Sequence, residues 1–105
     1  MADATEPIRQ RASEYPNVDE GTSCTQSSFK TGGKAFLFIG EQGGRHKAMF
    51  KLKASRDEAA RMAAKAPKDF QIGKGVWITA RFSDDAPLSD EIWKRWLDES
   101  YELSQ

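Results

Sequence analysis

Cys24 and His46 are the two residues whose types could form a nucleophile and its base. A cysteine becomes a useful nucleophile when a neighbouring base removes its proton. The alternation of residues 46–53, which we predict to be a strand, places His46 on the inward face of a sheet. A structural cysteine and a hydrogen-bonded histidine are therefore favoured. Because no acid–base or nucleophilic set converges in the sequence, we expect that the protein is not an enzyme.

Metal and phosphate sites are also poorly supported by the sequence. One cysteine and one histidine cannot complete a typical structural zinc site. The acids Asp3, Glu6, Glu14, Asp19 and Glu20 are loosely spaced and are typical of solvated surface. The segments TGGK and GGRHK could bind an anion through backbone N–H groups, but neither matches a P-loop and a hairpin turn explains each. We therefore predict no metal and no cofactor.

Charge is distributed unevenly along the chain. The 16 basic and 16 acidic residues give a net charge of zero, which is unusual for a nucleic-acid-binding protein. Yet residues 30–82 contain 12 Lys and Arg against four acids, while the two ends carry an excess of acids. The field at a surface depends on local charge, so the basic middle of the chain predicts a surface that attracts anions.

The composition is typical of one small globular domain spanning residues 1–105. The hydrophobic fraction of 38%, with three Trp and six Phe, suits a folded core. We find neither an apolar run of membrane-spanning length nor the apolar centre of a signal peptide. A single cysteine fits a reducing compartment. We therefore expect a soluble cytoplasmic protein.

The basic residues would be positioned by short helices and strands that are separated by turn residues. We predict helices over residues 3–14 and 55–66 and after Ser89, with N-caps at Thr5 and Ser89 and a capping box between Ser55 and Glu58. Strands are predicted over residues 24–30, 34–40, 46–53, 69–72 and 76–82, and residues 18–23 read as a loop. The order α-β-β-β-α-β-β-α predicts a two-layer α+β fold, with an antiparallel sheet and helices on one face.

Two of the predicted strands alternate between apolar and basic side chains. The predicted inward residues are His46, Ala48, Phe50, Leu52, Val76, Ile78, Ala80 and Phe82. The predicted outward residues are Arg45, Lys47, Met49, Lys51, Lys53, Trp77, Thr79 and Arg81. An antiparallel sheet with one solvated face would therefore present a basic, partly aromatic surface.

Three interpretations of this surface remain open. The first is a nucleic-acid interface, in which cations neutralise phosphates and an aromatic ring stacks on a base. The residues predicted to form it are Lys34, Arg45, Lys47, Lys51, Lys53, Trp77 and Arg81. The second is an interface for an acidic protein, since the same charges would attract carboxylates. The third is a solvated face whose lysines discourage aggregation between sheet edges.

Four short motifs resemble the MmcQ/YjbR family of small bacterial proteins. They are FKTGGKAF, KAMFKLK, GKGVWITARF and WLDESYEL, and the resemblance extends from Tyr15 to Leu103. It implies an α+β fold with helices on one face of an antiparallel sheet, similar in shape to bacterial frataxin homologues. It also implies DNA binding through a double wing formed by two β-hairpins. By position, the wings would be the turns over residues 31–34 and 42–45.

Overall fold

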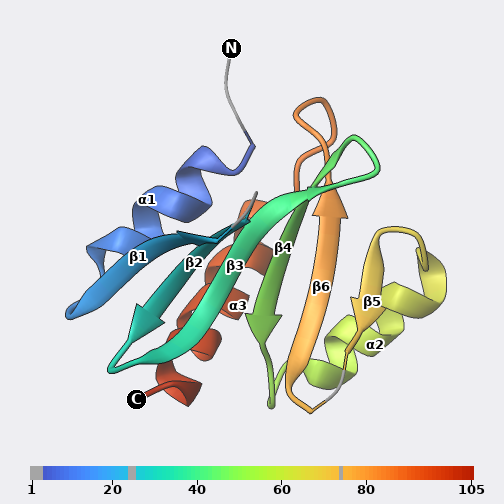
Figure 1. The fold of residues 1–105 in the computed structure, drawn as a ribbon. Coiled ribbons are helices and arrows are strands. Elements are labelled where there is room, and N and C mark those ends of the chain that lie inside the picture. Colours follow the sequence, from blue (N-terminus) through green and yellow to red (C-terminus); the bar gives the residue numbers. More distant parts are fainter. Residues whose placement is uncertain (1–3, 24–25, 74) are drawn as a thin grey trace.

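The computed structural model describes residues 4–23, 26–73 and 75–105 (Figure 1). These residues form three helices and six strands. In chain order they are α1 (Glu6–Glu14), β1 (Val18–Ser23), β2 (Gln26–Thr31), β3 (Lys34–Gln42), β4 (Arg45–Lys51), α2 (Arg56–Lys65), β5 (Phe70–Ile72), β6 (Trp77–Phe82) and α3 (Asp90–Leu103).

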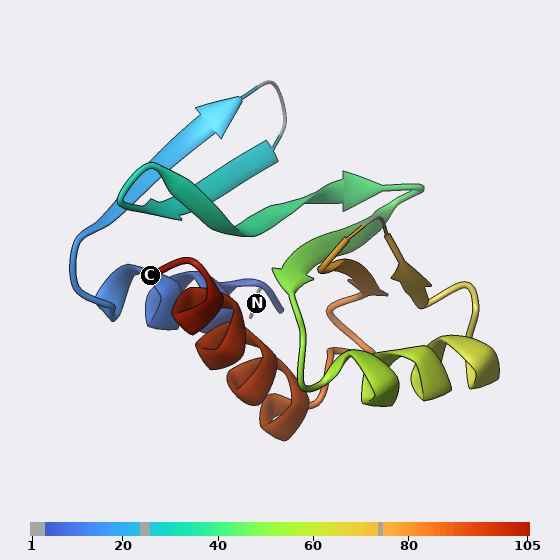
Figure 2. The same cartoon turned by 90° about the horizontal axis from the view of Figure 1, so that it is seen from below.

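The six strands form one antiparallel sheet in the order β1-β2-β3-β4-β6-β5. All three helices lie on the same side of the twisted sheet, which leaves its other face open (Figure 2). Helix α3 packs against β3 and β4, with α1 towards β1 and α2 towards β5. The predicted α+β fold with helices on one face is confirmed.

The predicted loop over residues 18–23 is wrong, because these residues form strand β1. This edge strand pairs with β2 along its whole length, from Val18 opposite Thr31 to Ser23 opposite Gln26. Its sequence VDEGTS is poor in the residues that favour strands. Only Val18 among its described side chains packs against the core. Pairing with β2, rather than local propensity, therefore forms this strand.

Strand β3 contains a bulge that changes which side chains face the helices. Successive residues of β2, Phe29 and Lys30, pair with Leu37 and Ala35, so Phe36 is the extra residue. The neighbours Phe36 and Leu37 are consequently both fully buried. Beyond the bulge the strand alternates regularly, with its odd-numbered residues on the helix side.

The core fills the space between the sheet and the helices. Trp96 of α3 lies at its centre, with its ring edge-on to Phe50 and Phe70. The other fully or almost fully buried apolar residues come from all three helices and from four of the strands or the segments beside them, and they include Ile8, Ala12, Phe29, Leu37, Ile39, Ala48, Leu52, Ala59, Ile78, Ala80, Phe82 and Leu97.

The capping box predicted between Ser55 and Glu58 does not form. Thr5, Ser55 and Ser89 occupy the N-cap positions as predicted, but none makes a side-chain capping hydrogen bond. The Glu58 carboxylate instead accepts hydrogen bonds from Trp96 Nε1 at 3.0 Å and from the guanidinium of Arg95. These bonds hold the pKa of Glu58 below its ordinary value and join α2 to α3.

Glu99 of α3 takes over the role expected of a cap. Its carboxylate accepts hydrogen bonds from the backbone N–H groups of Lys53 and Ser55, at 2.5 and 3.2 Å, and from Ser55 Oγ at 2.7 Å. Burial alone would raise the pKa of this carboxyl, but the hydrogen bonds outweigh burial and lower it. Glu99 thereby fixes the connection between β4 and α2 onto α3.

Within the described parts of the chain, no helix is both long enough and apolar enough to cross a membrane.

Candidate nucleic-acid interface

The open face of the sheet brings together basic and apolar side chains from β3, β4 and β6. Pairing between the strands places Phe38 beside Met49, Lys51 beside Trp77, and Lys47 beside Arg81. We call these six residues the open-face cluster. Within these three completely described strands, no outward-facing position is acidic. The centre of the open face therefore carries three cations and three large apolar side chains.

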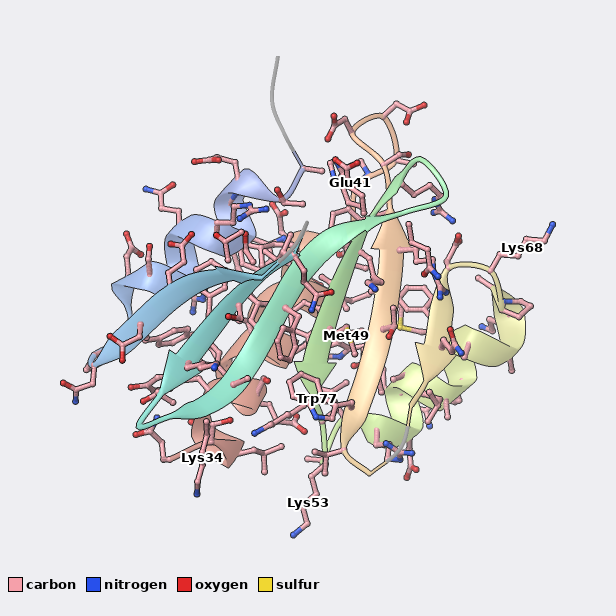
Figure 3. All side chains as sticks on the ribbon, in the orientation of Figure 1. Lys34, Glu41, Met49, Lys53, Lys68 and Trp77 are labelled. Atoms are coloured by element: carbon pink, nitrogen blue, oxygen red, sulfur yellow. The ribbon has the colours of Figure 1, made fainter. Side chains whose placement is uncertain are left out.

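The apolar side chains form the middle of the cluster. The rings of Phe38 and Trp77 lie 5.2 Å apart between centroids and are inclined by 46°. Met49 and Trp77 lie over the middle strands in Figure 3. All three side chains are half-buried, so each keeps part of its surface in contact with solvent. An aromatic surface of this kind can stack on a planar ligand.

Lys51 lies next to Phe38 and Trp77, which we call the aromatic pair. Its Nζ lies 5.5 Å from the centroid of the Trp77 ring and donates to Ser104 Oγ at 3.0 Å. Burial, followed by the charge of Lys34, lowers the pKa of Lys51. A partly desolvated ammonium group near a second cation would gain from a bound anion, because the anion offsets both effects.

Arg81 and Lys47 complete the cationic part of the cluster. Arg81 Nε donates to Gln42 Oε1 and its Nη2 to Gln71 Oε1, both at 2.8 Å. The two neutral amides orient the guanidinium group without neutralising its charge. Among the described residues, neither Lys47 nor Arg81 has an ion-pair partner. Both charges are therefore available to an anion from outside.

Three of the predicted interface residues lie elsewhere. Arg45 Nη1 forms an ion pair with Asp69 at 2.8 Å, so its charge is neutralised within the protein. Lys53 follows the end of β4 and lies at the lower edge of the sheet in Figure 3, where Lys34 also lies, at the start of β3. These three lie outside the open-face cluster, and the strand pattern gives neither the end of β4 nor the partner of Arg45; their part in binding stays a prediction.

One inward prediction differs from the structure, and the prediction for His46 agrees with it. Val76 was expected inside, but it precedes β6 and is 37% exposed. His46 is half-buried, with its ring beside Phe82 and its Nε2 at 2.8 Å from Asp84 Oδ1. Cys24 lies outside the described residues, so its pairing with His46 stays untested. Within the described ranges, no three His, Cys, Asp or Glu residues gather closely enough to hold a metal ion.

The two Gly-Gly turns lie at opposite ends of β3, as Figure 1 shows. Gly33 and Gly44 adopt positive φ angles of 82° and 78°, as tight hairpin turns require. Because β3 has nine residues, the turns are separated by about 30 Å. The turn at Gly44 also adjoins a hollow lined by Glu41, Asp84 and Asp85. The two turns therefore do not form one continuous basic surface.

Ser100 joins three of the sequence motifs in the fold. Its hydroxyl accepts from the Lys51 N–H at 2.8 Å and donates to the Phe36 carbonyl. Regular pairing of β3 with β4 ends at Leu37, one residue after Phe36, so the hydroxyl bridges the two strands where they separate. Tyr101 packs its ring edge-on against Phe36. These motif residues thus form a buried junction behind the open-face cluster.

Sequence reasoning missed some residues of the interface and some that support it. Phe38 and Met49 were not recognised as a joint apolar surface, because the pairing register that places them side by side is not visible in either strand alone. The alternation of residues 46–53 did place Met49 outside, and this was the available signal. The contributions of Gln42, Gln71 and Ser100 depend on contacts between distant elements, for which no sequence signal exists.

A family model and a solved structure are similar to this chain. The model of the YjbR family matches residues 13–103. The crystal structure of Deinococcus radiodurans protein DR2400, with the family-model domain DUF419, is similar at a TM-score of 0.73 and 16% identity. The similarity covers 96% of this chain and 78% of that one. No curated protein matches the chain. Neither matching description names an activity or a ligand. From the extent of the family match, the chain belongs to the YjbR family.

Proposed function

We propose that this domain binds DNA through the open face of its sheet, with the open-face cluster at the centre of the contact. The observation that carries the proposal is the composition of the cluster, in which Lys47, Lys51 and Arg81 surround the aromatic pair. Cations that neutralise phosphates supply most of the affinity of non-specific DNA binding. Aromatic rings add contacts to bases. Little sequence specificity is expected.

The arrangement of the cations suits an extended, regularly charged ligand. Lys47 and Lys51 are four residues apart on β4, which corresponds to about 13 Å along the strand. Arg81 lies directly beside Lys47 on β6. The helices cover the other side of the sheet, so the ligand can approach only this face at its centre (Figure 2). Because three cations are available on this face, we expect three contacts to phosphate groups.

Charge reversal at Lys47 tests the proposal directly. Affinity for a fluorescein-labelled oligonucleotide, measured by fluorescence anisotropy at low salt, should fall by about tenfold in Lys47→Glu, since one attraction becomes a repulsion. Lys68→Glu is the matched control, because Lys68 is exposed at the right-hand edge of the molecule in Figure 3, away from Trp77 and Met49. Equal losses in both variants would mean that net charge, rather than this face, determines binding.

The salt dependence gives a second measure of the same contact. Three phosphate contacts predict that the logarithm of affinity falls with the logarithm of salt with a slope between about −2 for a single strand and about −3 for a duplex. A slope near zero would contradict phosphate binding.

An acidic protein on the same face remains the alternative, because its carboxylates would meet the same three cations. Competition separates the two candidates. Unlabelled DNA should displace the labelled oligonucleotide far better than polyglutamate of equal charge, since polyglutamate offers no rings to Phe38 and Trp77. Equal displacement by the two polymers would favour the acidic protein.

A further inference from the structure

We infer that the open face binds single-stranded DNA in preference to duplex DNA. The inference rests on the DNA binding proposed above and adds the state of the strand that is bound. Bases within a duplex stack on one another and present only their edges to a protein, whereas an unpaired base offers its whole flat surface. The side chains that distinguish the two states are therefore those that can stack.

The aromatic pair lies where an unpaired base could reach it. Phe38 on β3 and Trp77 on β6 come together across β4, where Met49 pairs with Phe38. Methionine is flexible and polarisable, so it adapts to the ring that it contacts. Next to Phe38 on the same face comes Gly40, which is buried against the side chain of Gln26. Phe38 and Trp77 themselves are half-buried, so part of each ring stays exposed to solvent.

The charges are placed for a strand whose bases face the sheet. Lys51 Nζ lies over the Trp77 ring, 5.5 Å from its centroid, so a base that stacks on the exposed part of the aromatic pair brings its own phosphate close to the ammonium group. Lys47 and Arg81 lie further along the same two strands and would meet the next phosphates. Rings in the middle and cations on both sides match a single strand, in which bases and phosphates alternate along one chain.

A duplex finds less to bind on this face. Its grooves are read by elements that protrude, such as a helix or a two-stranded ribbon. The turns that could protrude lie about 30 Å apart at the two ends of β3. One of them adjoins a hollow of mixed charge, lined by Arg45 and His46 as well as by Glu41, Asp84 and Asp85. The flat aromatic centre of the sheet would remain unused by stacked base pairs.

Two substitutions at Trp77 separate stacking from charge. Trp77→Leu removes the ring and Trp77→Phe keeps an aromatic ring, while neither changes the charge. Both variants and the parent protein are titrated with an oligothymidine and with a duplex of equal length. Trp77→Leu should bind oligothymidine about 5- to 150-fold more weakly, as expected for the loss of one stacked base, and Trp77→Phe should recover most of the affinity. Duplex affinity should change little.

Fluorescence of the parent protein gives a readout that needs no substitution. Trp93 and Trp96 are buried, at 4% and 0% exposure, so Trp77 is the tryptophan that a ligand can reach. Oligothymidine should quench its emission at saturation, and the duplex should quench it less.

The results distinguish the preference for single strands from the DNA binding on which it rests. Tighter binding of oligothymidine, lost in Trp77→Leu and recovered in Trp77→Phe, supports the inference. If duplex binds equally or more tightly and Lys47→Glu weakens it, the inference is wrong and DNA binding stands. If neither DNA binds, both are wrong. Thermal unfolding of each variant identifies any substitution that acts by unfolding the domain.

Discussion

Ser100 shows how one hydroxyl group can hold two strands at the point where they part. It is fully buried, and it satisfies both the Lys51 N–H and the Phe36 carbonyl. Backbone groups that lose their partners inside a protein are costly, because no water replaces the lost bond. The position of Lys51 in the open-face cluster therefore depends on a residue that no ligand would touch.

We expect Ser100→Ala to lower the free energy of unfolding by about 1–3 kcal/mol, since it leaves two backbone groups unpaired. Urea unfolding at neutral pH measures the change. Ser13→Ala is the matched control, because Ser13 is exposed on α1 and its hydroxyl donates to the nearby Gln10 carbonyl. The control should change stability by less than about 0.5 kcal/mol. An equally small change in Ser100→Ala would show that the bridge is dispensable.

At the scale of the elements, α3 organises the fold by contacts that cannot be read from its own sequence. A helix after Ser89 was predicted from the sequence, and its Trp93, Trp96 and Leu97 are buried. Its polar residues have roles that depend on the tertiary structure. Glu99 binds the start of α2, and the last turn reaches Lys51 through Ser104.

The carboxylate of Glu99 makes part of the stability depend on pH. Its pKa in the folded protein lies below the ordinary value of 4.5, so its contribution is present above about pH 4.5 and is lost as the pH falls through the folded pKa. We expect Glu99→Gln to be less stable than the parent near neutral pH, and the difference to shrink below about pH 4.5. Urea unfolding across this pH range measures it.

Glu102→Gln serves as the control for this prediction, since Glu102 is an exposed glutamate three residues further along the same helix. It should leave the acid dependence of stability unchanged. A difference between Glu99→Gln and the parent that stays constant with pH would mean that the Glu99 charge plays no part.

Prediction from sequence succeeded where a strand or helix has its own periodic pattern. Strands β3, β4 and β6 and the helices α2 and α3 were found because apolar residues recur at the spacing of each structure. Strand β1 was missed because its pairing with β2 forms it. The bulge at Phe36 was missed because it is a property of two paired strands.

At the scale of the whole molecule, the sheet has one covered face and one open face, and the open face gathers charge that the total of zero conceals (Figures 1 and 2). Alternation along β4 and β6 was sufficient to predict Lys47, Lys51, Trp77 and Arg81 on this face. It could not show that Arg45 is neutralised by Asp69, or that Phe38 comes across to Trp77. Those facts require the strand order and register.

The most direct test of DNA binding by the open face is an NMR titration of the isotopically labelled protein with a short oligonucleotide, first at low and then at moderate salt. The account predicts shifts of backbone signals at Lys47, Lys51 and Arg81 and of the Trp77 indole N–H, and it predicts that they fade as salt rises. An absence of shifts at low salt, or shifts confined to the helices on the covered side, would contradict it.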